Sequence, residues 1–167
     1  MRVLAVSGAS GGHIFPALAF LESLSRKEKS IECLLVLPKK SIKDNIDIHN
    51  YNVRYISITS IKLSLDFKNI VSLLNFFKGA FESLIIILEF KPDRIIGFGS
   101  LVCIPMLLFG WIFRIQTAVH EQNVMPGRAN IFLAKFLDRI CLSFQKSRDY
   151  FKQYDYNCTC SNSQKRR

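Results

Sequence analysis

The sequence predicts an α/β domain in which a Rossmann-like parallel sheet carries flanking helices. Two observations favour this fold: short apolar, β-branched segments alternate with longer amphipathic segments, and a glycine-rich turn separates the first strand from the first helix. The chain has 167 residues, of which 49% are hydrophobic, so it can bury the core of one ordinary domain.

The first half of the chain begins with a strand at 3–6, followed by a helix that has Pro16 near its first turn. Further strands are expected at 31–37 and 53–59. The polar stretch 39–45 between them is expected to form a loop or a short helix. The apolar residues of the first helix share one face, namely Ala17, Phe20, Leu21 and Leu24.

A long helix is expected over 67–90, where apolar residues recur at helical spacing up to a stop at 91–93. From 156 to 167 the sequence has neither helical nor strand periodicity, which predicts an irregular tail. The elements in between are a strand at 94–96, a glycine turn at 97–100, a helix from about 101, a strand at 116–119, a helix at 128–136 and a strand at 139–142.

Lysine and arginine outnumber aspartate and glutamate by 23 to 13, and the formal net charge of +10 favours an anionic partner. A phosphorylated ligand or an acidic membrane surface fits this charge. The cations are dispersed and no RNA- or DNA-binding motif accompanies them, so we expect no nucleic-acid partner. The five cysteines form no CxxC pair and no secretory signal opens the chain, which predicts reduced thiols, no metal site and a cytoplasmic protein.

The glycine-rich turn at 8–13 (GASGGH) lies between the first strand and its helix, where backbone amides can approach a diphosphate or a sugar. It is not the GxGxxG fingerprint, and the second strand ends without a ribose-binding carboxylate, so a nicotinamide dehydrogenase is disfavoured. The alternative is a tight turn with no ligand. His13 is a candidate general base or ligand donor, or a helix-capping residue.

Two later segments occupy equivalent positions after strands. The turn at 97–100 (GFGS) can present amides and a hydroxyl to the same cleft, although a purely structural turn explains it equally well. The loop at 120–123 (HEQN) places four hydrogen-bonding side chains after an apolar strand, which favours site lining. Ligand sites of parallel sheets lie at such carboxyl ends.

Three motifs in this order, GASGGHIFP at 8–16, KPDRIIGFG at 91–99 and HEQNVMPG at 120–127, strongly resemble the N-terminal domain of the MurG-type glycosyltransferases of family 28. The resemblance covers most of residues 1–155. It implies the N-terminal half of a two-domain GT-B enzyme. That enzyme transfers N-acetylglucosamine from UDP-N-acetylglucosamine to an undecaprenyl-linked muramyl-pentapeptide, converting lipid I to lipid II in peptidoglycan synthesis, by an inverting reaction without a required metal or other cofactor.

The resemblance also implies roles for individual residues. The catalytic residues would be His13 and Glu121, and His13, with Glu121 nearby, would serve the acceptor hydroxyl or its diphosphate. Substrate-binding residues would be Ser10, Gly11, Gly12, Gly97, Gly99, Ser100, Gln122 and Asn123. The chain departs from the family pattern in its second loop, because GFGSLVCIP stands where GxGGYxSGP is usual, and Ser100 and Ile104 replace glycines.

The segment 67–81 mixes apolar bulk with cations, which is typical of an interfacial helix, although an ordinary core helix explains it equally well. By the resemblance, an apolar patch ringed by basic residues docks the domain as a peripheral protein on the anionic cytoplasmic face of the bacterial inner membrane. That patch would consist of Phe67, Leu74, Phe77, Lys78, Phe81 and Trp111.

The expected organisation is an acceptor- and membrane-binding domain at 1–155 and an irregular tail at 156–167, with no donor-binding C-terminal domain in these 167 residues. A truncated or split enzyme fits this organisation. Such a half would be inactive alone and would need a separate chain carrying the donor domain. The alternative function is a non-catalytic subunit that anchors a two-chain glycosyltransferase to the membrane.

Overall fold

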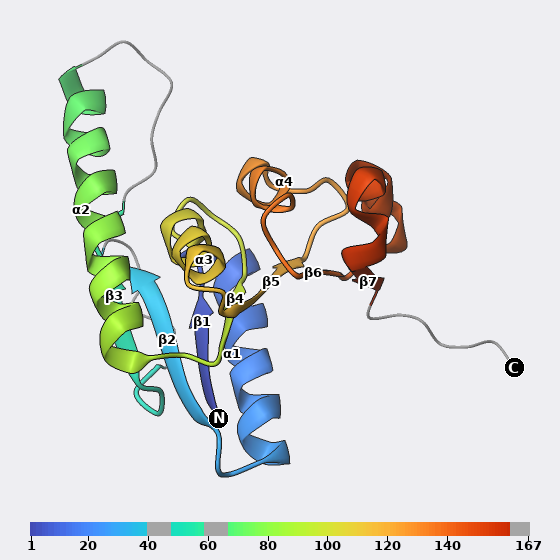
Figure 1. Ribbon diagram of the computed structural model, residues 1–167, viewed down its shortest axis with the longest axis horizontal. Coiled ribbons are helices and arrows are strands. Elements are labelled where there is room, and N and C mark those ends of the chain that lie inside the picture. Colours follow the sequence, from blue (N-terminus) through green and yellow to red (C-terminus); the bar gives the residue numbers. More distant parts are fainter. Residues whose placement is uncertain (40–47, 59–66, 161–167) are drawn as a thin grey trace, which may run out of the picture.

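A computed structural model describes residues 1–39, 48–58 and 67–160 of the chain (Figure 1). All strands of the described part pair in parallel in one sheet, in the order β3-β2-β1-β4-β5-β6-β7. The α/β Rossmann-like fold and its six expected strands are therefore confirmed. The strands are β1 (Arg2–Val6), β2 (Glu32–Pro38), β3 (Val53–Ile56), β4 (Arg94–Gly97), β5 (Gln116–Glu121), β6 (Arg139–Leu142) and β7 (Cys158–Cys160).

The face of the sheet on which each helix lies depends on the direction in which the chain crosses from one strand to the next. From β1 to β3 it moves one way, and from β4 to β6 it moves the other way. Because crossovers between parallel strands are right-handed, these two sets of connections lie on opposite faces. The helices are α1 (Gly11–Lys27) on one face and α2 (Phe67–Phe90), α3 (Cys103–Ile112) and α4 (Arg128–Leu133) on the other, followed by the 3-10 helix η1 (Gln145–Asn157).

Each face has its own buried core. On the α1 face, Ala5 and Leu35 of the sheet pack against Ile14, Ala17 and Leu21 of the helix. On the other face, the alternate strand residues pack against α2, α3 and α4. This larger core includes Leu4, Val6, Leu34, Val36, Ile95, Val119, Ile140, Ile86, Met106, Leu107 and Leu133. The alternation of strand residues between the two cores follows from the period of two in a pleated strand.

The prediction of an irregular tail from 156 is wrong for residues 156–160. The helix η1 continues to Asn157, and β7 pairs with β6 in the register Ile140↔Cys158. Pairing satisfies backbone groups along the outer edge of β6, and a strand of three residues is too short to show periodicity in the sequence. Residues 161–167, and 40–45 of the polar stretch, lie outside the described residues.

The α1 face is only partly covered. Over β4 and β5 no described helix lies on it, and a cavity of about 590 Å³ extends there beside Phe20 and Leu24. Ile96 and Ala118 contribute to its floor and are half-buried, whereas Val119, which points to the opposite face, is fully buried. This opening follows from the topology, because the connections between β4, β5 and β6 all lie on the other face.

Helix α2 packs one side on the sheet and presents the other to solvent. Gly79, Ser83, Ile86 and Ile87 are buried on the inner side. The structure therefore does not support an ordinary core helix. Outward, seven large apolar side chains are between 38% and 63% exposed, namely Val71, Leu73, Leu74, Phe77, Phe81, Ile85 and Leu88. Within the described residues, the part Val71–Phe90 is the one helix long and apolar enough to cross a membrane by length and composition.

The other residues expected at a membrane have mixed outcomes. Lys78 is exposed on α2, and Trp111 at the end of α3 is half-exposed. The side chain of Phe67 lies outside the described residues. Trp111 packs against Phe136 at a ring-centroid distance of 5.1 Å, and the ammonium of Lys135 lies 4.8 Å from the centroid of the Phe136 ring. An aromatic and cationic surface therefore continues from the end of α3 to the end of α4.

Candidate functional site

Three loops meet where the neighbouring strands β1, β4 and β5 end, and the segment Phe98–Gly99 lies at their centre. The amide of Phe98 donates to the carbonyl of Val6 at 2.8 Å, which ties this segment to the end of β1. From the third loop, the side-chain amide of Gln122 donates to the carbonyl of Phe98 at 3.1 Å. The predicted convergence of 8–13, 97–100 and 120–123 is therefore present in the structure.

The glycine turn leads directly into α1. Ser10 is the N-cap residue with extended dihedral angles, and its carbonyl accepts from the amides of His13 and Ile14. Its side chain makes no capping hydrogen bond, and Gly11 and Gly12 are exposed in the first turn. The first amides of a helix have no partner inside the helix, and the helix dipole favours negative charge there. The turn can therefore receive an anionic group.

The imidazole of His13 packs against Gly99. A β-carbon placed on Gly99 would lie 2.8 Å from Cε1 of His13 and 2.9 Å from its Nδ1, and Gly99 has a φ of 90°. Both the close approach and the left-handed backbone require glycine at this position. Nδ1 of His13 is buried without a hydrogen-bond partner in the described part of the chain.

Ser100 adopts a left-handed conformation with a φ of 78°, which is unusual for a residue with a side chain. Its neighbour in the turn after β1 is Gly8, where an added β-carbon would come within 2.6 Å of the β-carbon of Ser100. The turns after β1 and β4 are therefore in direct contact at these two residues, and Ser100 holds backbone strain there.

We expect Ser100→Gly to stabilise the domain by about 0.5–1 kcal/mol. Glycine relieves the cost of about 1–2 kcal/mol that a side chain incurs in the left-handed conformation, but it also raises the conformational entropy of the unfolded chain, which offsets part of the gain. Ser10→Gly is the control, since Ser10 has a φ of −75° and gains no relief. Urea unfolding of both variants checks the prediction. A lower stability of Ser100→Gly would contradict it.

Glu121 is a buried carboxylate, 1% exposed, and each of its two oxygens accepts two hydrogen bonds. Oε1 accepts from the backbone amide of Asn123 at 2.9 Å and from its side-chain amide at 3.2 Å. Oε2 accepts from the amide of Gly127 at 3.0 Å and from Nδ2 of Asn130 at 2.8 Å. The carboxylate therefore holds the loop after β5 in shape and joins it to α4.

His120 lies behind the same segment. Its ring packs edge-on against Phe98 at a centroid distance of 5.6 Å, and its Nε2 lies 3.1 Å from the hydroxyl of Ser143. Burial lowers the pKa of His120, while the charge of Glu121 acts in the opposite direction. The imidazole is consequently neutral at pH 7.

Four buried side-chain atoms in the described residues have no hydrogen-bond partner, and all four belong to residues around Phe98–Gly99. They are Nδ1 of His13, Nδ1 of His120, Oε1 of Gln122 and Oδ1 of Asn130. Asn130 belongs to this group because its Nδ2 would lie 3.7 Å from a β-carbon on Gly99. Buried polar atoms are normally paired, so this concentration of unpaired ones indicates a ligand site.

The structure brings together most residues predicted for the site, and it adds Asn130. His13, Gly99, Ser100 and Gln122 lie at the contact between the loops. Asn130 was missed because a single Asn in the 128–136 helix carries no sequence signal of its own. Gly97 turns inward, where an added β-carbon would lie 2.7 Å from Leu107. Within the described residues, no group of three or more His, Cys, Asp or Glu side chains could hold a metal ion.

The profile of the glycosyltransferase family 28 N-terminal domain matches residues 3–142, which includes all three loops. The chain belongs to glycosyltransferase family 28. This family 28 chain is 36% identical over 152 residues to the UDP-N-acetylglucosamine–N-acetylmuramyl-(pentapeptide) pyrophosphoryl-undecaprenol N-acetylglucosamine transferase of Bacillus subtilis, and 37% identical over 152 residues to that of Natranaerobius thermophilus.

The matches cover 90% of this family 28 chain but only 42% and 41% of the two relatives, so the chain spans less than half of their length. The crystal structure of Acinetobacter baumannii MurG superposes with a TM-score of 0.74 at 23% identity, covering 87% of this chain and 42% of that one. The fold is accordingly that of one half of a GT-B protein.

Proposed function

We propose that residues 1–155 form the acceptor- and membrane-binding half of an N-acetylglucosaminyltransferase, with UDP-N-acetylglucosamine as donor and an undecaprenyl-linked muramyl-pentapeptide as acceptor. The names of the relatives state this reaction for those proteins. The observation that carries the proposal to this chain is the group of unpaired buried atoms around Phe98–Gly99, at the carboxyl end of the sheet. The rest of the donor site would come from outside residues 1–155, in the same polypeptide or in a partner chain.

In the proposed reaction, a hydroxyl of the acceptor attacks the anomeric carbon of N-acetylglucosamine. The bond from that carbon to the UDP oxygen breaks, and UDP leaves with the electron pair. His13 accepts the proton of the attacking hydroxyl. The exposed first turn of α1, at Gly11 and Gly12, would hold a diphosphate through backbone amides and the helix dipole.

We assign Glu121 a positioning role rather than the part in the chemistry that the resemblance implied. A general base needs a free lone pair directed at the substrate, and both of its oxygens already accept two hydrogen bonds. Its carboxylate fixes the backbone of Asn123, and Ser147 donates to the Asn123 carbonyl at 2.8 Å. Asn123 is thereby held exposed at the rim, as a contact to the sugar nucleotide requires.

We also propose that α2 places the domain on the cytoplasmic face of the membrane, as a peripheral protein. An interfacial helix needs an apolar face beside cations, and the exposed face of α2 carries Phe77 and Phe81 next to Lys78. The first turns of α2 stand beyond the carboxyl ends of the neighbouring strands (Figure 1), on the same side as the candidate site. A lipid-linked acceptor could then reach His13 without leaving the bilayer.

The test is a chimaera in which residues 1–155 replace the matching part of the Bacillus subtilis relative. We expect it to transfer radiolabelled N-acetylglucosamine from UDP-N-acetylglucosamine to lipid-linked muramyl-pentapeptide. A folded chimaera that transfers nothing would overturn the proposed activity. If the same chimaera still bound anionic vesicles, the result would favour the non-catalytic membrane-anchoring subunit instead.

A further inference from the structure

The inner side of α2 carries a polar contact with the ends of two strands. The carboxylate of Glu82 accepts a hydrogen bond from the backbone amide of Ser57, just after β3, and another from its hydroxyl at 3.0 Å. The ammonium of Lys39, just after β2, lies 2.7 Å from Oε1 of Glu82 and 3.0 Å from the Ser57 hydroxyl. These three residues, which we call the α2 clasp, tie the helix to the carboxyl edge of the sheet.

One turn before Glu82, the helix comes into direct contact with the chain that follows β3. A β-carbon on Gly79 would lie 2.3 Å from Cγ1 of Ile58 and 3.1 Å from the carbonyl carbon of Ser57. The helix therefore packs directly against the segment after β3 at this point, next to the polar contacts of Glu82. Gly79 and Glu82 both lie on the side of α2 that contacts the segment after β3, whereas Phe77 and Phe81 are exposed to solvent.

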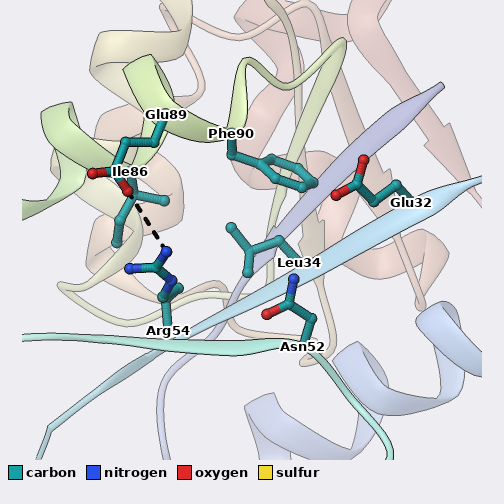
Figure 2. Close-up of a pocket in the computed structure, with 7 residues that line it drawn as sticks. All are labelled: Glu32, Leu34, Asn52, Arg54, Ile86, Glu89 and Phe90. Atoms are coloured by element: carbon teal, nitrogen blue, oxygen red, sulfur yellow. Dashed lines mark ion pairs between the residues drawn. The ribbon is translucent and has the colours of Figure 1, made fainter.

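A second ion pair lies two turns further along the helix and differs in exposure. Arg54 of β3 and Glu89 of α2 are 3.6 Å apart and line a cavity of about 210 Å³, and Figure 2 shows their ion pair as a dashed line between the strand and the helix. Both of these side chains are more than half exposed, whereas in the clasp Lys39 is 53% exposed but Glu82 only 20%, and Glu82 also accepts from the backbone amide of Ser57. Exposed pairs contribute little, so the clasp is the stronger of the two polar attachments.

We propose that Glu82 is a positioning residue that fixes the rotation of α2, so that the apolar face with Leu74, Phe77 and Phe81 points outward at the carboxyl edge of the sheet. The membrane consequence of this inference rests on the proposed function. Without the clasp, the seven exposed apolar side chains would favour a rotated or frayed helix that buries some of them. Only part of the population would then present the face that binds lipid.

The negative charge of Glu82 should strengthen the attachment of α2 to the sheet. The groups that face this carboxylate are Lys39 from the end of β2 and Ser57 from the end of β3. Burial alone would raise the pKa of Glu82, but the hydrogen bonds from Lys39 and Ser57 bring it below the ordinary value of 4.5. Because the pKa of Glu82 is lower in the folded protein than in the unfolded chain, its ionised carboxylate stabilises the folded state at pH values above the unfolded-state pKa. This stabilisation is lost as the pH falls through the folded-state pKa.

The test compares Glu82→Gln with Glu89→Gln, the same change on the exposed pair, by amide hydrogen exchange of α2 and by binding to vesicles with anionic lipid. We expect Glu82→Gln to reduce the exchange protection of α2 by about tenfold and vesicle affinity by about fivefold, with Glu89→Gln near wild type. Introduced into the wild-type protein, Lys39→Met should reduce the exchange protection of α2. Introduced into the Glu82→Gln variant, it should have little further effect. The difference between wild type and Glu82→Gln should shrink as the pH falls below 4.5.

Equal protection of α2 in Glu82→Gln, Glu89→Gln and wild type would overturn the clasp. A wild-type protein that does not bind vesicles would instead contradict the membrane role under the proposed function, while the exchange comparison would still decide the clasp. If Glu82→Gln does not fold, Lys39→Met carries the same comparison, because it leaves the carboxylate paired with Ser57.

Discussion

Replacing Glu121 by alanine is expected to destabilise the domain by about 3–5 kcal/mol, more than any other single change at the site. The substitution removes the acceptor of four N–H groups, from Asn123, Gly127 and Asn130, and leaves Nδ2 of the buried Asn130 without this partner. Glu121→Gln should cost somewhat less, because it keeps the shape but turns one oxygen into a donor that faces other donors. Urea unfolding of both variants measures the loss.

The control for this experiment is Glu22→Ala on α1. Glu22 makes an ion pair with Arg26 at 2.6 Å, but both side chains are more than half exposed. Its loss should change the stability by less than about 0.5 kcal/mol. A cost for Glu121→Ala as small as that of Glu22→Ala would mean that the loop after β5 does not depend on this carboxylate.

The second large effect concerns activity. In the chimaera described above, His13→Ala is expected to lower kcat by about 10²–10⁴-fold, which is the usual contribution of a general base. The unfolding midpoint should change little, because Nδ1 of His13 has no hydrogen-bond partner to lose. Steady-state kinetics with varied acceptor concentration measure kcat and KM separately.

His13→Gln is the companion variant, because it keeps a polar side chain at this position but cannot accept a proton at neutral pH. It should be as inactive as His13→Ala while binding the acceptor better. If either variant kept more than a tenth of the wild-type kcat, His13 would not be the base, and the neutral imidazole of His120 would become the next candidate.

The fold could be predicted because its signals are local. Buried β-branched strands, the turn at 8–13 and the helical spacing over 67–90 are properties of short windows, and all correspond to elements of the structure. The strand β7 could not be predicted in this way. Three residues carry no period, and their conformation depends on pairing with β6, which lies outside any window as short as the strand itself.

The site could be predicted only in part, for a similar reason. The loops follow strands whose order is implied by topology, so their convergence was expected, and Gln122 and His13 lie where the pattern placed them. The partners of Glu121 could not be read from the sequence, because hydrogen-bond saturation depends on the path of the loop to Gly127 and α4. The residue type alone does not distinguish a structural glutamate from a catalytic one.

The open α1 face over β4 and β5 affects how this polypeptide behaves at high concentration. Its apolar floor, with Ile96 and Ala118, is a surface on which two copies could associate. Arg94 and Arg139 on its rim are exposed and outnumber the exposed Asp138 beside them, so the net positive charge of the rim opposes such contact. Salt at 0.1 M screens exposed charges beyond about 10 Å, so added salt would weaken that repulsion and lower the colloidal stability of the protein.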